Sequence, residues 1–206
     1  MDLVYIIFAL VMALTLHEFA HAWMSDYLGD RTARSHGRLS INPLVHIDPI
    51  MTVLLPIALI VAHSPVLFGA ARPVPFNPWA VRYGRWGAAL VAAAGPLMNL
   101  LLACFFALWL QLFPVGALAQ LFIAIIAVNV GFMVFNLMPI PPLDGSRVVY
   151  AAIPQIRGLF DAIEQNGLIL IFVLLIFAGP LLTGIIGPIV AAILSLLIPG
   201  LTGLST

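Results

Sequence analysis

Long apolar segments constrain the fold of this chain more than any other feature of its sequence. A helix needs about 20 consecutive apolar residues to cross the hydrocarbon core of a bilayer, and residues 86–112 and 118–138 each reach this length. Only 8% of the 206 residues are charged and 63% are hydrophobic, so lipid rather than water must cover most of the surface. The sequence therefore predicts an all-α polytopic membrane protein.

The first apolar segment is expected to be a retained membrane helix. It should run from Leu3 to Leu28, because Gly29 is a plausible C-terminal stop. Asp2 stands where a signal peptide would carry basic residues, and the segment shows no small-residue cleavage site. We therefore count it among the spans.

The remaining segments predict a single membrane-embedded domain over residues 1–206. A core of about residues 1–150 should be followed by a C-terminal helical hairpin at about 163–198. Residues 51–70 have nearly the length of a span but are interrupted by proline and histidine, so they form either a re-entrant or a sixth membrane segment. We expect about five transmembrane helices besides that segment.

The positions of the charged residues favour the re-entrant alternative. All eight basic residues are arginine, and short arginine-rich loops usually face the cytoplasm. If residues 51–70 enter the membrane and return to the same face, all eight arginines lie on that face. The N-terminus is then outside the cell and the C-terminus inside. Eight acidic residues balance them, so no overall field would attract nucleic acid, and we expect no such partner.

Residues 17–21 of the first predicted helix read HEFAH. His17 and His21 are four residues apart, so both imidazoles lie on one helix face and can reach one metal ion. Glu18 points to one side of that pair and can take a proton from a water on the metal. Ionisable groups inside an apolar span are costly unless they are paired, hydrated or bound to metal. The alternative is a buried polar cluster that joins helices.

A catalytic zinc ion usually has three protein ligands, so one more residue is needed. The candidates are Asp144, His46, Asp48, His63 and Glu164. Asp144 follows a proline-rich break in a helix, where freed backbone groups require a polar cavity. Judged on these residues alone, the favoured role of Asp144 is to cap a short helix beginning near Gly145. Three roles are open for His46: a surface polar residue, a group that orients one of the metal ligands, or an accessory metal ligand.

The chain resembles the site-2 protease family, intramembrane zinc metalloproteases that cut transmembrane segments of other proteins. HEFAH resembles the family's HExxH, and NLMPIPPLDG, residues 136–145, resembles its NxxPxPxLDG. AGPLMN, residues 94–99, is similar to the GPxxN element, and GARPVPFNP, residues 69–77, to a loop of short bacterial members. The resemblance implies one catalytic Zn²⁺ held by His17, His21 and Asp144, which reverses the preference for a capping role. It also implies location in a prokaryotic plasma membrane. The arginine pattern predicts that the active site lies toward the cytoplasmic side.

The same resemblance implies peptide hydrolysis with Glu18 as the general base and then the general acid. Asn136 and Asn99 are candidates to contact the oxyanion or the substrate backbone, with helix-to-helix hydrogen bonding as the alternative. Partners would be transmembrane segments of membrane-protein substrates and the lipid bilayer. Residues 35–41 and 71–76 could form a small β-like hairpin that pairs with an unwound substrate. Unlike better known members, the chain shows no PDZ or CBS domain and no span before HEFAH.

Two other classes of function remain open from the sequence. A membrane metal-binding or transport protein would also carry His, Asp and Glu at depth, but it should show a polar path across the bilayer. Residues 86–112 carry no charged residue, which argues against such a path. A non-catalytic helix-binding scaffold would have no need of the intact Glu18.

Overall fold

In the computed structural model three long helices form the centre of the protein. These are α1 (Leu3–Tyr27), α4 (Arg85–Leu112) and α5 (Gly116–Asn136). The structure describes residues 2–61, 71–113, 116–164 and 179–199. Around the three helices are shorter elements: α2 (Thr32–Ser35), the 3-10 helix η1 (Pro43–Val45), the π-helix η2 (Pro49–Leu54), α3 (Leu55–Val61), α6 (Asp144–Ala152), the 3-10 helix η3 (Pro154–Ile156), α7 (Arg157–Glu164) and α9 (Gly179–Leu197).

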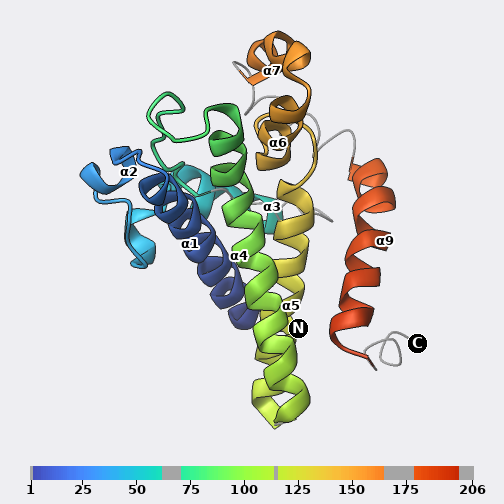
Figure 1. Cartoon of the computed structure of the whole chain (residues 1–206). Coiled ribbons are helices and arrows are strands. Elements are labelled where there is room, and N and C mark those ends of the chain that lie inside the picture. The colour runs from blue at the N-terminus through green and yellow to red at the C-terminus, as the bar shows by residue number, and fades with distance from the viewer. Residues whose placement is uncertain (1, 62–70, 114–115, 165–178, 200–206) are drawn as a thin grey trace.

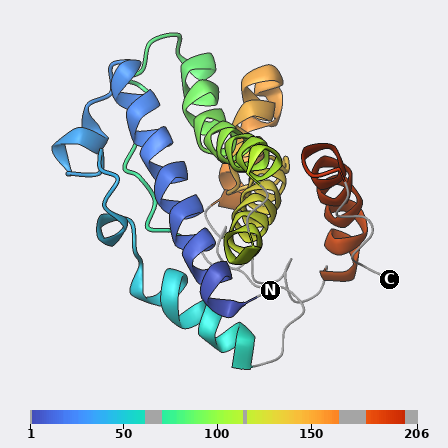
Figure 2. The same ribbon diagram turned by 90° about the horizontal axis from the view of Figure 1, so that it is seen from below.

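The three central helices are long and apolar enough to cross a membrane. Figure 1 shows α4 and α5 as a long hairpin with α1 packed across it, and Figure 2 shows α1 and α9 on opposite sides of that hairpin. Together with the composition, this makes the chain an integral membrane protein of helical type. The finer prediction of about five or six spans remains a prediction, because residues 62–70 and 165–178 lie outside the described residues.

Local sequence explains where the first helix begins and ends. The carboxylate of Asp2 accepts a hydrogen bond from the backbone N–H of Val4 at 3.2 Å, which caps the start of α1. Leu28 follows the last helical residue, and Gly29 takes a φ of 112°, a conformation that side chains disfavour. The predicted helix from Leu3 to Leu28 is thus confirmed to within one residue.

Small residues bring the central helices close together. Buried alanines recur on the facing surfaces of all three helices, and in a membrane such residues let helix backbones approach. The set comprises Ala9, Ala13 and Ala20 of α1, Ala88, Ala92, Ala103 and Ala107 of α4, and Ala124 of α5. Isoleucine, valine and methionine side chains of α5 fill the space between α4 and α9. This close approach allows short polar side chains on different helices to meet.

The expected β-like hairpin is not observed. Residues 35–41 and 71–76 are described, and neither stretch is a strand. In the first stretch, His46 Nε2 donates to the backbone oxygen of Ser40 at 2.7 Å, and the Arg38 side chain donates to Val45 O, outside both stretches. Pro73 and Pro75 also lack the N–H groups of a ladder. One backbone hydrogen bond, from Arg72 N to His46 O at 2.8 Å, connects the second stretch to the segment that follows the first.

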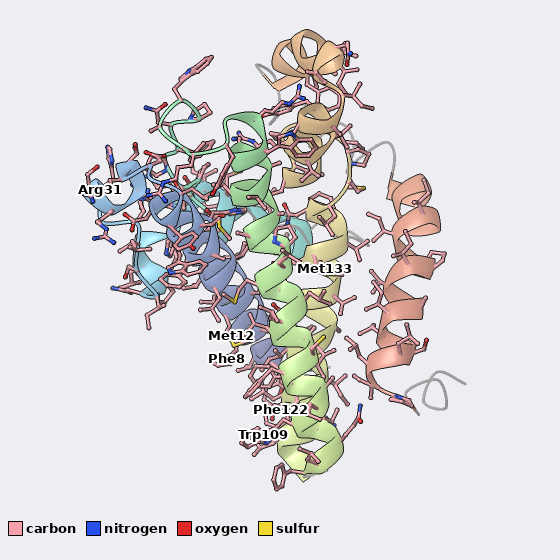
Figure 3. The ribbon with its side chains drawn as sticks, viewed as in Figure 1. Phe8, Met12, Arg31, Trp109, Phe122 and Met133 are labelled. Carbon is pink, nitrogen blue, oxygen red and sulfur yellow. The ribbon has the colours of Figure 1, made fainter. Side chains whose placement is uncertain are left out.

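Arginine-bearing loops gather at one end of the molecule. Figure 3 shows Arg31 far from Trp109 and Phe122, which lie near the opposite end of the α4–α5 hairpin. Helices α2 and α6 and the loop before α4 lie toward the same end as Arg31 (Figure 1). This distribution agrees with the arginine pattern expected for one membrane face.

Asp30 joins three segments at that end. Its Oδ1 accepts hydrogen bonds from Thr32 N at 3.0 Å and from Thr32 Oγ1, and its Oδ2 accepts from Ser25 Oγ at 3.0 Å and Asn77 N at 2.8 Å. Burial alone would raise the pKa of Asp30, but these hydrogen bonds to the charged form outweigh it and lower the pKa below its ordinary 3.8. Asp30 therefore fixes the loop that leads into α4.

Replacing Asp30 with Asn should destabilise the protein in a pH-dependent way. An amide cannot accept from all these donors, and hydrogen bonds to a charged group contribute about 1.5–3 kcal/mol. Because the folded pKa is lowered, the contribution is complete above 3.8 and is lost as pH falls through the folded pKa. Thermal unfolding in detergent should show a gap between wild type and Asp30→Asn that closes in acid. Asp2→Asn, which keeps an exposed cap, should show little change, and a gap for Asp30→Asn that is the same at every pH would contradict this role.

Candidate metal centre

Three ligand atoms from two distant parts of the chain meet beside α1. His17 Nε2 and His21 Nε2 lie 2.9 Å apart. Asp144 Oδ2 lies 3.2 Å from His17 Nε2 and 3.4 Å from His21 Nε2. Ligands of a tetrahedral zinc ion, bonded at 2.0–2.2 Å, are separated by about 3.3 Å. The three distances are therefore close to the edges of one zinc coordination tetrahedron.

The hydrogen bonds of the two imidazoles leave both Nε2 lone pairs facing the centre. His17 Nδ1 lies 2.6 Å from Asn99 Oδ1, and His21 Nδ1 lies 2.7 Å from the backbone oxygen of Val91. Both oxygens can only accept, so each Nδ1 carries the proton in a neutral ring. Two unprotonated nitrogens at 2.9 Å then face each other and the carboxylate oxygen. With both rings neutral, a single metal ion among the three atoms could accept all three lone pairs.

Burial makes the need for a cation stronger. His17 is 3% exposed, and Asp144 Oδ2 is buried without a hydrogen-bond donor among the described residues. The ring of Phe132 packs edge-on against His17, with 5.1 Å between centroids. A buried, unsatisfied carboxylate oxygen is costly. The donor set of two imidazoles and one carboxylate is one that zinc accepts in catalytic sites.

Asp144 enters the site from the first turn of α6. The residue before it, Leu143, occupies the N-cap position, and no side chain caps this helix. The alternative that Asp144 caps a helix near Gly145 is therefore not observed. Gly145 allows the approach, since a Cβ there would lie 2.2 Å from Leu137 O. The chain can turn back tightly after α5 only because this residue lacks a side chain.

Gly95 provides space for the two histidines on the α4 side. A Cβ at this residue would lie 2.4 Å from His21 Nε2 and 2.6 Å from His17 Nε2. Asn99 lies one turn further along α4, where it reaches His17 Nδ1. The GPxxN element thus supplies close packing from its glycine and a hydrogen-bond acceptor from its asparagine. Val91 on the preceding turn supplies the acceptor for His21.

Glu18 and Asn136 border a cavity beside the three ligand atoms. The cavity has a volume of about 220 Å³. Its wall is formed by the metal-binding candidates, by parts of α4, α5 and α6, and by the 71–76 segment. The other lining residues are Ser25, Ala71, Pro73, Val74, Phe76, Ala88, Val91, Ala92, Phe132, Phe135, Pro142, Leu143 and Arg147. Asn99 is not among the lining residues and is 0% exposed. A reactant in this cavity can therefore meet Glu18 and Asn136 but not Asn99.

The other candidates for the third ligand have different surroundings. His46 is buried and donates from Nε2 to Ser40 O, while its Nδ1 has no partner among the described residues. Asp48 Oδ1 accepts from the N–H groups of Ile50 and Met51 and so caps η2. His63 and the side chain of Glu164 lie outside the described part. Within the described residues, His17, His21 and Asp144 are the group that could hold a metal ion.

Sequence reasoning missed three contributors to this site. Val91 acts through its backbone carbonyl, which any residue could supply, so no sequence signal exists for it. Gly95 lay within the AGPLMN element, but its role depends on how closely α4 approaches α1. Asn129 is 0% exposed and accepts a hydrogen bond from Asn99 Nδ2 at 2.9 Å. An amide within an otherwise apolar span was the signal that could have found it.

Comparison with known proteins agrees with this geometry. The family model described as peptidase family M50 matches residues 111–179, which include Asn136 and Asp144. The protein named "Putative zinc metalloprotease YwhC" from Bacillus subtilis (strain 168) is 36% identical over 200 residues, covering 91% of this chain and 86% of the relative. No solved structure shows a significant match.

Mycobacterial relatives carry a similar name. "Putative zinc metalloprotease Rip2" from Mycobacterium tuberculosis (strain ATCC 25618 / H37Rv) is 32% identical over 182 residues, which cover 84% of this chain and 66% of the relative. The Mycolicibacterium smegmatis protein of the same name is 31% identical over 170 residues, which cover 81% of this chain and 64% of that relative. The matched regions thus span about two thirds of these two relatives. The matches do not favour a transporter or a non-catalytic scaffold, and the chain belongs to peptidase family M50, the site-2 proteases, as an intramembrane zinc metalloprotease.

Proposed function

We propose that His17, His21 and Asp144 hold the catalytic zinc and that Glu18 acts as the general base in hydrolysis of membrane-protein substrates. The observation that carries this assignment is the convergence of three lone-pair-bearing atoms within 3.4 Å of one another. Both histidines use their other nitrogen for a hydrogen bond, an arrangement typical of zinc ligands. The buried Asp144 oxygen completes the set.

Glu18 is the group best placed to move protons in the cavity. When bound, zinc would acidify an attacking water and polarise the scissile carbonyl. The Glu18 carboxylate would accept the proton of that water and return it to the leaving amine. Glu18 neighbours His17 in sequence and lines the same cavity, which gives it access to both reacting groups.

Asn136 and Asn99 are assigned different roles. Asn136 Nδ2 donates one hydrogen bond to Phe132 O at 3.0 Å. No acceptor for its second N–H is found in the described part of the chain, so this group could donate to a substrate carbonyl or oxyanion. Asn99 Nδ2 donates to both Ala13 O and Asn129 Oδ1. With both N–H groups engaged away from the cavity, Asn99 serves as the acceptor that orients His17.

The substrate would be a transmembrane segment that has lost its helical hydrogen bonds near the site. Intact helices keep their carbonyls bonded internally, so an unwound stretch must enter the cavity. The cavity is bordered by the membrane helices α4 and α5 and by the irregular 71–76 segment. It lies toward the arginine-bearing end of the fold, which supports a site facing the cytoplasm of a prokaryotic cell, with the N-terminus outside.

Replacing Glu18 with Gln should abolish cleavage while leaving zinc bound. The amide keeps the size of the side chain but cannot accept the proton, and loss of general acid–base catalysis costs about 10²–10⁴-fold in rate. Zinc stoichiometry of the purified protein and cleavage of a membrane-helix substrate measure the two properties. Equal cleavage by both proteins would remove Glu18 from its assigned role, and a wild-type protein purified without chelators that binds no zinc would remove the ligand assignment.

Replacing Gly95 with Ala should weaken zinc binding without unfolding the protein. The added methyl would lie 2.4 Å from His21 Nε2 and 2.6 Å from His17 Nε2, and it would displace at least one imidazole from its metal-binding position. Disturbing ligand orientation typically costs 10–100-fold in metal affinity, which competition with a chromophoric chelator can measure. Gly131→Ala is the matched control, because a Cβ there meets no described atom within 4 Å. Equal zinc affinity for the two variants would show that Gly95 does not shape the centre.

A further inference from the structure

His17 can bind a metal through Nε2 only in one of its two neutral tautomers. The proton must sit on Nδ1, because a proton on Nε2 would cover the lone pair that faces Asp144 and His21. The partner of Nδ1 decides which tautomer is stable. That partner is Asn99 Oδ1, at 2.6 Å in a fully buried environment.

The Asn99 amide could serve either tautomer. If its side chain turned over, the NH₂ group would face Nδ1 and would favour the proton on Nε2. His17 therefore depends on whatever holds the Asn99 oxygen toward it. Two acceptors do so: Asn99 Nδ2 donates to Ala13 O at 3.3 Å and to Asn129 Oδ1 at 2.9 Å.

Asn129 is itself held in a single orientation. Its Nδ2 donates to the backbone oxygen of Ile125 at 2.8 Å, and a carbonyl oxygen can only accept. The Oδ1 of Asn129 must then face Asn99. Each N–H therefore donates in the same direction, from His17 Nδ1 through the amides of Asn99 and Asn129 to Ile125 O. His17, Asn99 and Asn129 are buried inside the bundle of α1, α4 and α5. Two acceptors or two donors that face each other there are costly.

We propose that Asn129 is a positioning residue for the metal centre, which acts through Asn99 to keep His17 in the tautomer that presents Nε2 to the metal. This inference rests on the proposed role of His17 as a metal ligand. Asn129 touches neither the cavity nor the ligand atoms, and its contribution is to the direction of the hydrogen bonds.

The test compares Asn129→Leu in two backgrounds. Leucine has a similar size but no acceptor, so the Asn99 amide keeps only its longer hydrogen bond to Ala13 O at 3.3 Å to fix its orientation. Zinc affinity should then fall by about 10–100-fold. In an Asn99→Asp background the acidic side chain presents an acceptor to His17 Nδ1 in either orientation, so His17 no longer depends on Asn129. The second carboxylate oxygen then faces Asn129 Oδ1, another acceptor, and gains no hydrogen bond from it. There, Asn129→Leu should lower zinc affinity by no more than about twofold, the scatter expected of independent changes.

Chelator competition gives the affinities, and the visible spectrum of the Co²⁺-loaded protein reports ligand geometry independently of activity. The spectrum of Asn129→Leu should change in the wild-type background and stay constant in the Asn99→Asp background. Val130→Ala, which trims the neighbouring buried residue of α5, should lower thermal stability without altering affinity or spectrum. Equal losses of affinity in both backgrounds, or no loss in the wild-type background, would overturn the proposal.

Asn129→Ser keeps the experiment decisive if the leucine variant fails to fold. A serine hydroxyl can bond to its own helix, as Thr15 Oγ1 does to Val11 O at 2.6 Å, but it is too short to reach Asn99. It should reproduce the loss of zinc affinity. Failure of the proposed function would appear differently, as absence of zinc from the wild-type protein, whereas failure of this inference leaves wild-type zinc intact and the Asn129 variants unchanged.

Discussion

Everything in this fold depends on holding three lone-pair-bearing atoms together in an environment with little water. His17 Nε2, His21 Nε2 and Asp144 Oδ2 repel one another unless a cation lies between them. In the proposed site, bound metal would offset the cost of keeping them together, and each imidazole has a hydrogen-bond partner for its other nitrogen. The architecture around them supplies those partners from α4 and brings the carboxylate in from α6.

Close packing of small residues makes this possible. Buried alanines on α1 and α4 bring the two helices near enough for Asn99 to reach His17 and for Val91 O to reach His21. Gly95 and Gly145 remove side chains at the two points where backbone and ligands approach most closely. The same closeness lets α4 hold both imidazoles, through Asn99 Oδ1 and Val91 O.

The sequence predicted the parts of the structure that follow from local patterns. The length of the apolar runs located α1, α4 and α5, and the spacing of HEFAH placed both histidines on one face. Asp144 is separated from His21 by more than a hundred residues, and local reasoning favoured a cap; the LDG resemblance was needed to assign it to the site. Val91, Gly95 and Asn129 depend on tertiary contacts that no periodicity encodes. The β-like hairpin is not observed: His46 binds the backbone carbonyl of Ser40, and Pro73 and Pro75 lack N–H groups that a ladder needs.

The central claim is that two imidazoles and one carboxylate of this chain coordinate a single zinc ion. X-ray absorption at the zinc edge of the purified protein measures that ligand set directly. The spectrum should fit two imidazole nitrogens and light oxygen ligands at about 2.0–2.2 Å, and Asp144→Asn should alter the oxygen shell while both imidazoles remain. A spectrum with fewer or more than two imidazoles, or one that Asp144→Asn leaves unchanged, would contradict the account.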